Sequence, residues 1–213
     1  MPTGTRLTYR GRSITRCCLS NRAAGSLGLL LALVLSFCPG CSSRPSAAYQ
    51  AMDLDGKPAV LDAGPNGAAL VIVFLGVECP IANRCLPELV ALEKELAPQG
   101  VRFHHVYPNP DETAEVVRRH RREYQLSSTA YRDPEWRLAR QLHASRTPEA
   151  VALTPDGRRI YQGRINDQFA ALGVGKPEPT RHDLALALRD FLKGAPPSGI
   201  SQPAVGCSFR PAP

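Results

Sequence analysis

Residues 74–87 constrain the fold of this chain more than any other segment. They continue an apolar run, residues 69–75, which is short and rich in β-branched residues, as is typical of a strand buried on both faces. Cys79 and Pro80 then precede a helical pattern, which predicts that Cys79 lies at a helix N-terminus with a proline in the first turn. Free backbone N–H groups and the helix dipole stabilise a thiolate there. The sequence therefore predicts a reactive thiol, with a buried structural cysteine as the alternative.

The helix expected after Cys79 has one apolar stripe, formed by Cys85, Leu89, Leu92 and Leu96. This spacing predicts a core position for Cys85, and its alternative role is to resolve a disulfide of Cys79. Six residues of ideal helix advance about 9 Å along the axis, beyond the about 7 Å between Cα atoms that a disulfide tolerates. A bond between them would require local unwinding. Glu78 would raise the pKa of Cys79 and Arg84 would lower it, and the sequence leaves the balance open.

The first 40 residues have the pattern of an export signal, with five arginines, no acidic residue and then an apolar run over residues 23–37. That run is shorter than the ~20 apolar residues of a comfortable membrane span. Gly40-Cys41 after a leucine-rich core resembles a lipoprotein processing site, with Cys41 as the lipidated residue. A cleaved ordinary signal and an uncleaved anchor are the alternatives. All three place the rest of the chain outside the cytoplasm.

The charge of the chain gives no support to nucleic-acid binding. The formal net charge of +7 comes from 26 Lys and Arg against 19 Asp and Glu. Removing the five leader arginines leaves 21 basic residues, which nearly balance the 19 acidic ones. The four arginines within residues 118–122 are interpreted as a solvated helix face, with a docking surface for an acidic partner as the alternative.

Cysteine usage favours redox chemistry. Four of the seven cysteines lie in the leader, so the mature domain keeps Cys79, Cys85 and Cys207. An odd number in an exported protein leaves at least one thiol free or transiently paired. Residues 194–206, rich in Pro, Gly and Ser, span ~43 Å when extended and can bring Cys207 back to Cys79. We interpret Cys207 as a thiol that resolves an oxidised or mixed-disulfide form of Cys79. The alternative is an incidental thiol on a disordered tail.

The other segments alternate strand and helix patterns, as in α/β folds. We expect a hairpin over residues 51–61, a second core strand over residues 101–107, helices beginning at Asp111, at Asp133-Pro134 and at Thr180, and two strands within residues 147–161. Adjacent His104 and His105 would point to opposite faces of their strand, one packed and one exposed, and so would not share a metal ion. The polar run 163–168 is a candidate rim of the active site or an ordinary loop.

Residues 48–193 resemble the thioredoxin fold and, within it, the redoxin group, which joins thioredoxin-like oxidoreductases with alkyl hydroperoxide reductase/thiol-specific antioxidant proteins. In thioredoxins the nucleophilic cysteine follows a core strand and a proline stands eight residues after it, which are the places of Cys79 and Pro87. The second cysteine of the usual Cys-x-x-Cys pair is absent, because Ala82 stands there. Another cysteine must resolve the mixed disulfide, or none does.

A second part of the resemblance lies in the C-terminal half of the domain. In exported thioredoxin-like proteins a Thr-Pro or Val-Pro opens a hairpin that an Asp-Gly turn closes, as Thr147-Pro148 and Asp156-Gly157 do in this sequence. The resemblance implies that Pro148 is cis and that its backbone faces the nucleophile. It also implies that Thr147, Pro148 and Pro80 dock the substrate chain.

Two groups of proteins that share the resemblance suggest alternative functions. Peroxidases of the redoxin group carry a proline seven residues before the catalytic cysteine and Thr or Ser three before it, where this chain has Ile72 and Gly76. Copper-delivery proteins use Cys-x-x-x-Cys-Pro, and the place four after Cys79 is Asn83. A thiol-dependent peroxidase is one alternative. The other is a non-catalytic module that holds copper with Cys79, Cys207 and a histidine.

We therefore expect a leader over residues 1–41, a linker over 42–48, a thioredoxin-like α/β domain with a central mixed sheet over 49–193 and a flexible tail over 194–213. The expected function is an envelope thiol–disulfide oxidoreductase whose thiolate attacks a substrate disulfide and is released by a second thiol. Its partners would be protein or small-molecule disulfides and a thiol electron donor. We expect no cofactor, metal ion or nucleic acid, and a lipid anchor at the membrane.

Overall fold

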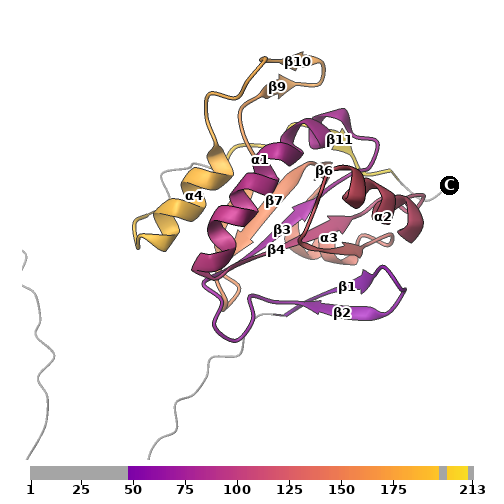
Figure 1. The fold of residues 1–213 in the computed structure, drawn as a ribbon, viewed down its shortest axis with the longest axis horizontal. Coiled ribbons are helices and arrows are strands. Elements are labelled where there is room, and N and C mark those ends of the chain that lie inside the picture. Colours follow the sequence, from indigo (N-terminus) through magenta and orange to yellow (C-terminus); the bar gives the residue numbers. More distant parts are fainter. Residues whose placement is uncertain (1–47, 197–200, 211–213) are drawn as a thin grey trace, which may run out of the picture. The chain divides into compact units, whose positions relative to one another are not determined.

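A computed structural model describes residues 48–196 and 201–210 (Figure 1). These residues belong to one compact unit, residues 43–213. The expected leader, with the lipidation site Cys41, lies outside the described residues. Among the described helices, none is both long and apolar enough to cross a membrane.

A seven-stranded mixed sheet forms the centre of the domain, in the order β2-β1-β5-β4-β3-β7-β8. Its strands are β1 (Tyr49–Asp53), β2 (Pro58–Leu61), β3 (Ala69–Phe74), β4 (Val101–Tyr107), β5 (Thr129–Arg132), β7 (Glu149–Leu153) and β8 (Arg159–Gly163). β3, β4 and β5 run parallel to one another, and β7 joins β3 antiparallel. The expected hairpins are present as β1–β2 and β7–β8. The sheet and its flanking helices confirm the predicted fold class.

Helices cover both faces of the sheet (Figure 1). They are α1 (Pro80–Leu96), η1 (Ala97–Gln99), α2 (Ala114–Glu123), α3 (Arg137–Leu142) and α4 (Asp183–Leu192). Alternate residues of β3 supply two apolar clusters, one shared with α1 and α4 and the other shared with α3. Each fully buried Leu or Ile in such a cluster contributes about 1.5–3 kcal/mol. The short strands are β6 (Arg146–Thr147), β9 (Phe169–Ala171), β10 (Val174–Gly175) and β11 (Cys207–Ser208).

Helix α1 begins as predicted. Cys79 is its N-cap residue, Pro80 occupies the first turn and Pro87 lies inside the helix. The predicted apolar stripe is buried at all four positions, which are Cys85, Leu89, Leu92 and Leu96. The strand that ends at Phe74 therefore delivers Cys79 to the start of a helix anchored in the core.

The start of α2 differs from the expectation, which placed Asp111 at the cap. Thr113 is the N-cap residue, and its side chain accepts a hydrogen bond from the Val116 N–H (3.4 Å). The carboxylate of Asp111 instead forms an ion pair with Arg210, which the sequence separates from it by 99 residues. A local capping pattern could not reveal this distant partner.

Helices α3 and α4 also begin later than expected. α3 starts at Arg137 rather than at Asp133-Pro134, yet the Asp133 carboxylate still accepts the N–H groups of Leu138 and Ala139 (3.3 and 2.8 Å). α4 starts after His182 rather than after Thr180, because Asp167 binds the backbone and hydroxyl of Thr180. Asp133 and Thr180 therefore both form hydrogen bonds near the start of a helix, but each lies farther from the first helical residue than an N-cap does.

The adjacent histidines on β4 point to opposite faces of the sheet, as predicted, but both are buried. His105 is fully buried and its Nε2 lies 2.5 Å from Oε1 of Glu93 on α1. His104 is 5% exposed and packs edge-on against Tyr131. The expectation that one is exposed is wrong, because β4 is a central strand covered on both faces.

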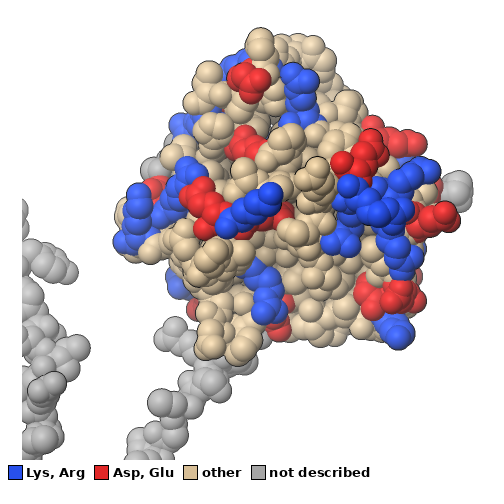
Figure 2. Space-filling model, viewed as in Figure 1, with Lys and Arg blue, Asp and Glu red and all other residues tan. Residues whose placement is uncertain are grey.

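The arginine-rich stretch 118–122 on α2 is only in part a solvated face. Arg118 donates to the carbonyl of Leu54 (2.8 Å) and Arg121 donates to the carbonyl of Ser128 (2.6 Å). On the face shown in Figure 2, basic side chains gather over α2, and acidic side chains lie beside them. Half of the run thus ties α2 to neighbouring loops.

Residues 201–210 lie against the domain, whereas the sequence predicted a flexible tail. β11 pairs antiparallel with β6, with Cys207 opposite Thr147. Farther back, the carbonyl of Gln202 accepts the Arg164 N–H (3.1 Å). The composition of the segment is typical of a linker, and the few residues that anchor it act only through contacts with distant parts of the chain.

Candidate active site

The sulfur of Cys79 lies where three parts of the chain meet. As the N-cap of α1, its Sγ accepts the N–H of Ala82 (3.5 Å). Its thiol donates to the carbonyl of Thr147 (2.9 Å), the last residue of β6. The side chain is 4% exposed. The predicted helix-terminal thiol is therefore in place, and it is covered.

The Thr147–Pro148 peptide bond is cis, which confirms the expectation from the resemblance. This bend brings the Thr147 carbonyl and hydroxyl toward the loop before Cys79. A Cβ added at Gly76 would lie 2.9 Å from the Thr147 hydroxyl and 3.4 Å from the Cβ of Cys79. Glycine at position 76 thus permits the loop and the cis-proline segment to approach each other closely. Pro80 is exposed beside this contact.

Cys207 is brought to Cys79 by the pairing of β11 with β6 (Figure 1). Its thiol and its backbone N–H both form hydrogen bonds with the sulfur of Cys79. The three cysteines of the described residues are free thiols. The structure therefore joins two of the predicted site cysteines, and Cys207 is the one that faces Cys79.

The two thiols have pKa values displaced in opposite directions. Burial acts to raise the pKa of Cys79, but hydrogen bonds from the Cys207 thiol, the Thr147 hydroxyl and the N–H groups of Ala82 and Cys207 outweigh it and lower the pKa. Burial and the neighbouring Cys79 sulfur raise the pKa of Cys207 to about 11. The proton of Cys79 is therefore lost more readily than in an ordinary thiol, and that of Cys207 is held more tightly.

The peptide of Val77, two residues before the nucleophile, is held on both sides. Its N–H donates to Oε1 of the buried Glu112 (2.8 Å), and its carbonyl accepts the side-chain amide of Asn83 (2.9 Å). The Asn83 oxygen in turn contacts Nε2 of His120 (2.9 Å). Sequence reasoning missed Glu112 and His120, because a single buried acid or histidine in a loop or helix carries no spacing signal. The position of Asn83, one turn after Cys79, was the available clue.

Arg210 closes the site from the C-terminal side. Its guanidinium pairs with Glu78 (2.9 Å), Asp111 (2.9 Å) and Glu112 (3.7 Å), and its backbone N–H donates to the side-chain oxygen of Asn109 (2.9 Å). The charge of Glu78, which the sequence suggested would act on Cys79, thus has a cationic partner. Arg210 also went unnoticed in the sequence, although it follows Cys207 by three residues.

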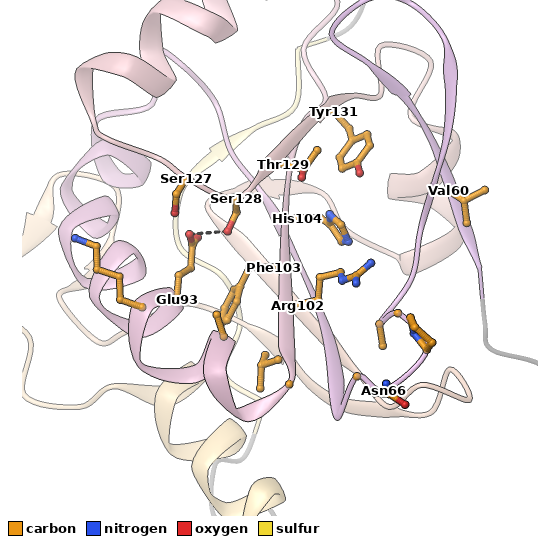
Figure 3. A pocket seen from close by; sticks show the side chains of 18 residues that line it. Val60, Asn66, Glu93, Arg102, Phe103, His104, Ser127, Ser128, Thr129 and Tyr131 are labelled. Carbon is orange, nitrogen blue, oxygen red and sulfur yellow. Dashed lines mark hydrogen bonds between the residues drawn. The ribbon is translucent and has the colours of Figure 1, made fainter.

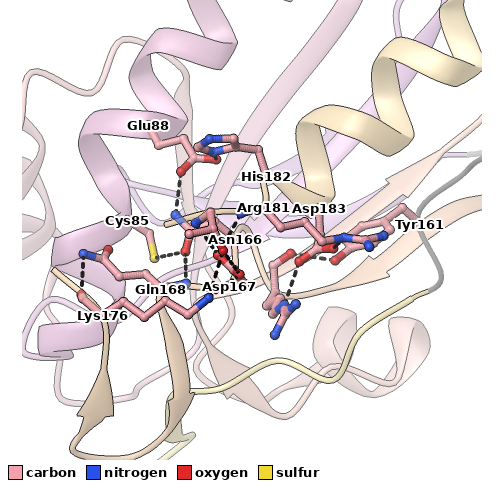
Figure 4. Close-up of polar contacts among 12 residues, drawn as sticks. Cys85, Glu88, Tyr161, Asn166, Asp167, Gln168, Lys176, Arg181, His182 and Asp183 are labelled. Carbon is pink, nitrogen blue, oxygen red and sulfur yellow. Dashed lines mark hydrogen bonds and ion pairs between the residues drawn. The ribbon is translucent and has the colours of Figure 1, made fainter. Parts of the chain in front are cut away.

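Cys85, on the same helix as Cys79, faces a polar cluster that includes Glu88 and Asn166 rather than the thiol pair (Figure 4). Its Sγ is 3.9 Å from the side-chain oxygen of Asn166, whose amide donates to Glu88 (2.5 Å). Burial, with the charges of Glu88 and Cys79, raises the pKa of Cys85 to about 12. This confirms the core interpretation of Cys85. It also shows that the candidate rim, residues 163–168, packs on α1 through Asn166.

A separate groove of about 820 Å³ lies at the opposite end of the sheet, where β3, β4 and β5 begin (Figure 3). His104, Arg102 and Glu93 line it, and Glu93 accepts the hydroxyl of Ser128 (2.6 Å). Cys79 follows the other end of β3, so this groove is not part of the thiol site. In the part of the chain that the structure describes, no group of three His, Cys, Asp or Glu side chains could hold a metal ion.

Comparisons with known proteins agree with the fold. No family model and no curated protein matches the chain. Among solved structures, an uncharacterized conserved protein from Geobacillus kaustophilus has a TM-score of 0.69 and 24% identity, over 79% of this chain and 91% of that one. A hypothetical protein from Sinorhizobium meliloti has a TM-score of 0.69 and 25% identity, over 79% and 93%.

The thioredoxin domain of a thiol-disulfide oxidoreductase from Bacteroides vulgatus is also similar, with a TM-score of 0.51 and 16% identity over 69% of this chain and 94% of that one. The chain thus has a thioredoxin-like fold, and the resemblance to thioredoxin-like redoxins is confirmed at the level of the fold.

Proposed function

We propose that the protein is a thiol–disulfide oxidoreductase in which Cys79 is the nucleophile and Cys207 the resolving thiol. The observation that carries this proposal is the pair itself. A buried sulfur at a helix N-terminus, beside a cis-proline, has a lowered pKa because a second thiol donates a hydrogen bond to it. Low-pKa thiols with a neighbouring thiol are suited to disulfide exchange.

In the first step the Cys79 thiolate attacks one sulfur of a substrate disulfide. A bond forms between Cys79 and that sulfur, the substrate S–S bond breaks and the second substrate sulfur leaves as a thiolate, which takes a proton. The N–H of Ala82 and the positive end of α1 stabilise the attacking thiolate. Thr147, whose carbonyl accepts the Cys79 thiol, would dock the substrate together with Pro148 and Pro80.

In the second step Cys207 loses its proton and attacks the Cys79 sulfur of the mixed disulfide. A Cys79–Cys207 disulfide forms and the remaining substrate thiolate leaves and is protonated, so the protein dithiol is oxidised by two electrons and the substrate disulfide is reduced. The high pKa of Cys207, about 11, keeps it protonated until Cys79 no longer carries a negative charge. An external thiol donor then reduces the protein disulfide and completes the cycle.

The two alternative functions receive less support. A threonine or serine at position 76, where peroxidases of the redoxin group carry one, would press on the Thr147 hydroxyl, 2.9 Å from the added Cβ. The copper alternative combines the two thiols with a histidine. Within residues 48–196 and 201–210, no group of three metal-binding side chains is present.

We also propose that the protein acts outside the cytoplasm and is anchored by lipid at Cys41. This part depends on the leader pattern of residues 1–41. Intact mass measurement of the protein recovered from membranes tests it. A diacylated N-terminal Cys41 supports the anchor, and an unmodified N-terminus at any other residue overturns it.

The proposed activity is tested by disulfide mapping and a disulfide-reductase assay on the full chain and on Cys79→Ser, Cys207→Ser and Cys85→Ser. We expect a Cys79–Cys207 bond in the oxidised protein, no activity for Cys79→Ser and a trapped substrate mixed disulfide for Cys207→Ser. Cys85→Ser is the matched control and should keep its activity. The proposal fails if no bond joins Cys79 and Cys207 and the wild-type protein exchanges no disulfide.

A further inference from the structure

The edge of β6 beside the cis-proline is already occupied by the chain's own C-terminal segment. Cys207 and Ser208 pair antiparallel with Thr147 and Arg146. The preceding Gly206 lies so close that an added Cβ would be 2.0 Å from the Thr147 carbonyl oxygen and 3.1 Å from Cδ of Pro148. An incoming strand that pairs with this edge needs the same backbone groups, so the two strands cannot be bound together.

The next side chain of the segment, Phe209, is inserted into an apolar spot. Its ring lies between Phe74 and Trp136, with centroid distances of 5.8 and 6.1 Å. A hollow of about 320 Å³ continues beside it, lined in part by Trp136 and Ala144. The spot therefore has the size and chemistry to accept an aromatic residue two positions after the cysteine.

The residue after it, Arg210, lies in an acidic spot. The carboxylates of Glu78, Asp111 and Glu112 converge on its guanidinium, and one oxygen of the buried Glu112 has no hydrogen-bond partner in the described residues. Three carboxylates with one arginine leave the spot with excess negative charge. It fits a basic residue three positions after the cysteine.

The segment is also fixed upstream of Cys207. The carbonyl of Gln202 accepts the Arg164 N–H (3.1 Å), and the Ser201 hydroxyl accepts the Gln162 N–H (3.3 Å). With anchors on both sides, the strand lies across the nucleophile, and Cys79 keeps only 4% of its surface exposed. A substrate can reach the sulfur only after this strand moves.

We propose that residues 206–210 occupy the position of the substrate strand and so keep the site closed, as an intramolecular latch. The substrate that replaces them is an extended peptide with an aromatic residue two positions after its cysteine and a basic residue three positions after it. The second half rests on the proposed function, because it names the substrate of the same site. The first half stands independently, because it concerns only access to the Cys79 sulfur.

Access is tested by the rate at which iodoacetamide alkylates Cys79 in the reduced full chain, measured at a pH at which Cys79 is fully ionised in every protein and followed residue by residue with mass spectrometry. Phe209→Ala and Arg210→Glu remove one anchor each, and we expect alkylation at least about tenfold faster, the change that follows from weakening a local closed state. Phe169→Ala and Arg189→Glu are matched controls, since these residues lie on β9 and α4, and they should react like the wild type. Equal rates in all five proteins overturn the latch.

Two readouts separate latch opening from general unfolding. Alkylation of the buried Cys85 in the same samples should not change, because α1 stays packed. The reaction of Cys79 should also shift to higher pH in the Arg210→Glu protein, since the hydrogen bonds from Cys207 that lower the pKa of Cys79 are lost. If Cys85 becomes reactive together with Cys79, the variant has unfolded, and opening of the latch is not the cause of the faster alkylation.

The substrate preference is tested with peptides whose single cysteine is activated as a mixed disulfide with thionitrobenzoate. We expect Val-Gly-Cys-Ser-Phe-Arg to react with Cys79 about tenfold faster than Val-Gly-Cys-Ser-Ala-Glu. Equal rates overturn the preference. Faster alkylation in the anchor variants without any disulfide-reductase activity of the protein overturns the proposed function and leaves the latch standing. Disulfide-reductase activity without faster alkylation overturns the latch and leaves the proposed function standing.

Discussion

Cys79 lies at the start of helix α1 and Cys85 lies six residues later within it, and each is 4% exposed. Their pKa values nevertheless move in opposite directions. The pKa of Cys79 is lowered, although burial acts to raise it, and the pKa of Cys85 is raised to about 12. An equal exposed fraction therefore does not produce equal thiol chemistry.

The difference between the two thiols lies in what faces each sulfur. Four hydrogen-bond donors from the helix N-terminus, β6 and β11 are directed at Cys79. At Cys85 burial is the main cause of the raised pKa, and the negative charges of Glu88 and Cys79 add to it. Donors at the sulfur stabilise the charged form, and at Cys79 they outweigh burial even though the thiol also donates to the Thr147 carbonyl.

The largest expected effect comes from exchanging each sulfur for oxygen. Cys79→Ser should lower disulfide-exchange activity at least about a thousandfold, because the nucleophile is lost. Cys85→Ser should change it by less than about threefold, since the hydroxyl keeps the hydrogen bond to Asn166. Initial rates with a model disulfide measure both. Comparable losses in the two variants would contradict the separation of roles.

The second prediction concerns alkaline pH. An unfolded thiol ionises near pH 8.5, whereas folded Cys85 keeps its proton to about pH 12, so the unfolded state loses a proton that the folded state retains. The free energy of unfolding contributed by Cys85 is thus complete below pH 8.5 and falls by ~2 kcal/mol at pH 10. Denaturant unfolding of the wild type and of Cys85→Ala, each at pH 7 and pH 10, measures this difference.

The control for this prediction is the variant itself. Cys85→Ala leaves a small cavity and should be less stable at pH 7 by ~1–2 kcal/mol. That deficit should disappear by pH 10, because the variant has no thiol to ionise in the unfolded state. A deficit of the same size at both pH values would show that burial does not raise the pKa of Cys85.

The smallest expected effect comes from the loop before Cys79. Glu112→Gln keeps an acceptor for the Val77 N–H but removes the charge that faces Arg210. We expect the attack of Cys79 to be slower by about threefold and the free energy of unfolding to fall by ~1 kcal/mol. Glu115→Gln, on the exposed side of α2, is the matched control. Stopped-flow reaction with a model disulfide and thermal unfolding measure the two quantities. Identical behaviour of both variants would exclude Glu112 from the site.

The part of the site carried by local sequence was predictable. A strand, a cysteine and a proline before a helical pattern place Cys79 at an N-cap, and the stripe that includes Cys85 places that residue in the core. The cis form of Pro148 followed from the resemblance. These features depend on residues close together in the chain, where spacing, caps and periodicity act directly.

The part carried by distant contacts was not predictable. A segment with the composition of a linker forms β11 because Phe209 and Arg210 find an apolar spot and three carboxylates, and the helix expected at Asp111 begins later because that carboxylate binds Arg210. The burial of both histidines on β4 depends in the same way on covering of both sheet faces. Arg210 and Glu78 are 132 residues apart in the sequence, so such partners can be separated by more than half of the chain.

The sequence by itself determined that a thiol would stand at the start of a helix and that a second thiol could reach it. Only the tertiary structure decided which thiol does so, which of the two has the lowered pKa, and that the strand bearing Cys207 covers the edge beside Pro148. The physical reason is that a reactive thiol needs a local backbone geometry, whereas its pKa and its accessibility are set by groups that folding brings from β6 and β11.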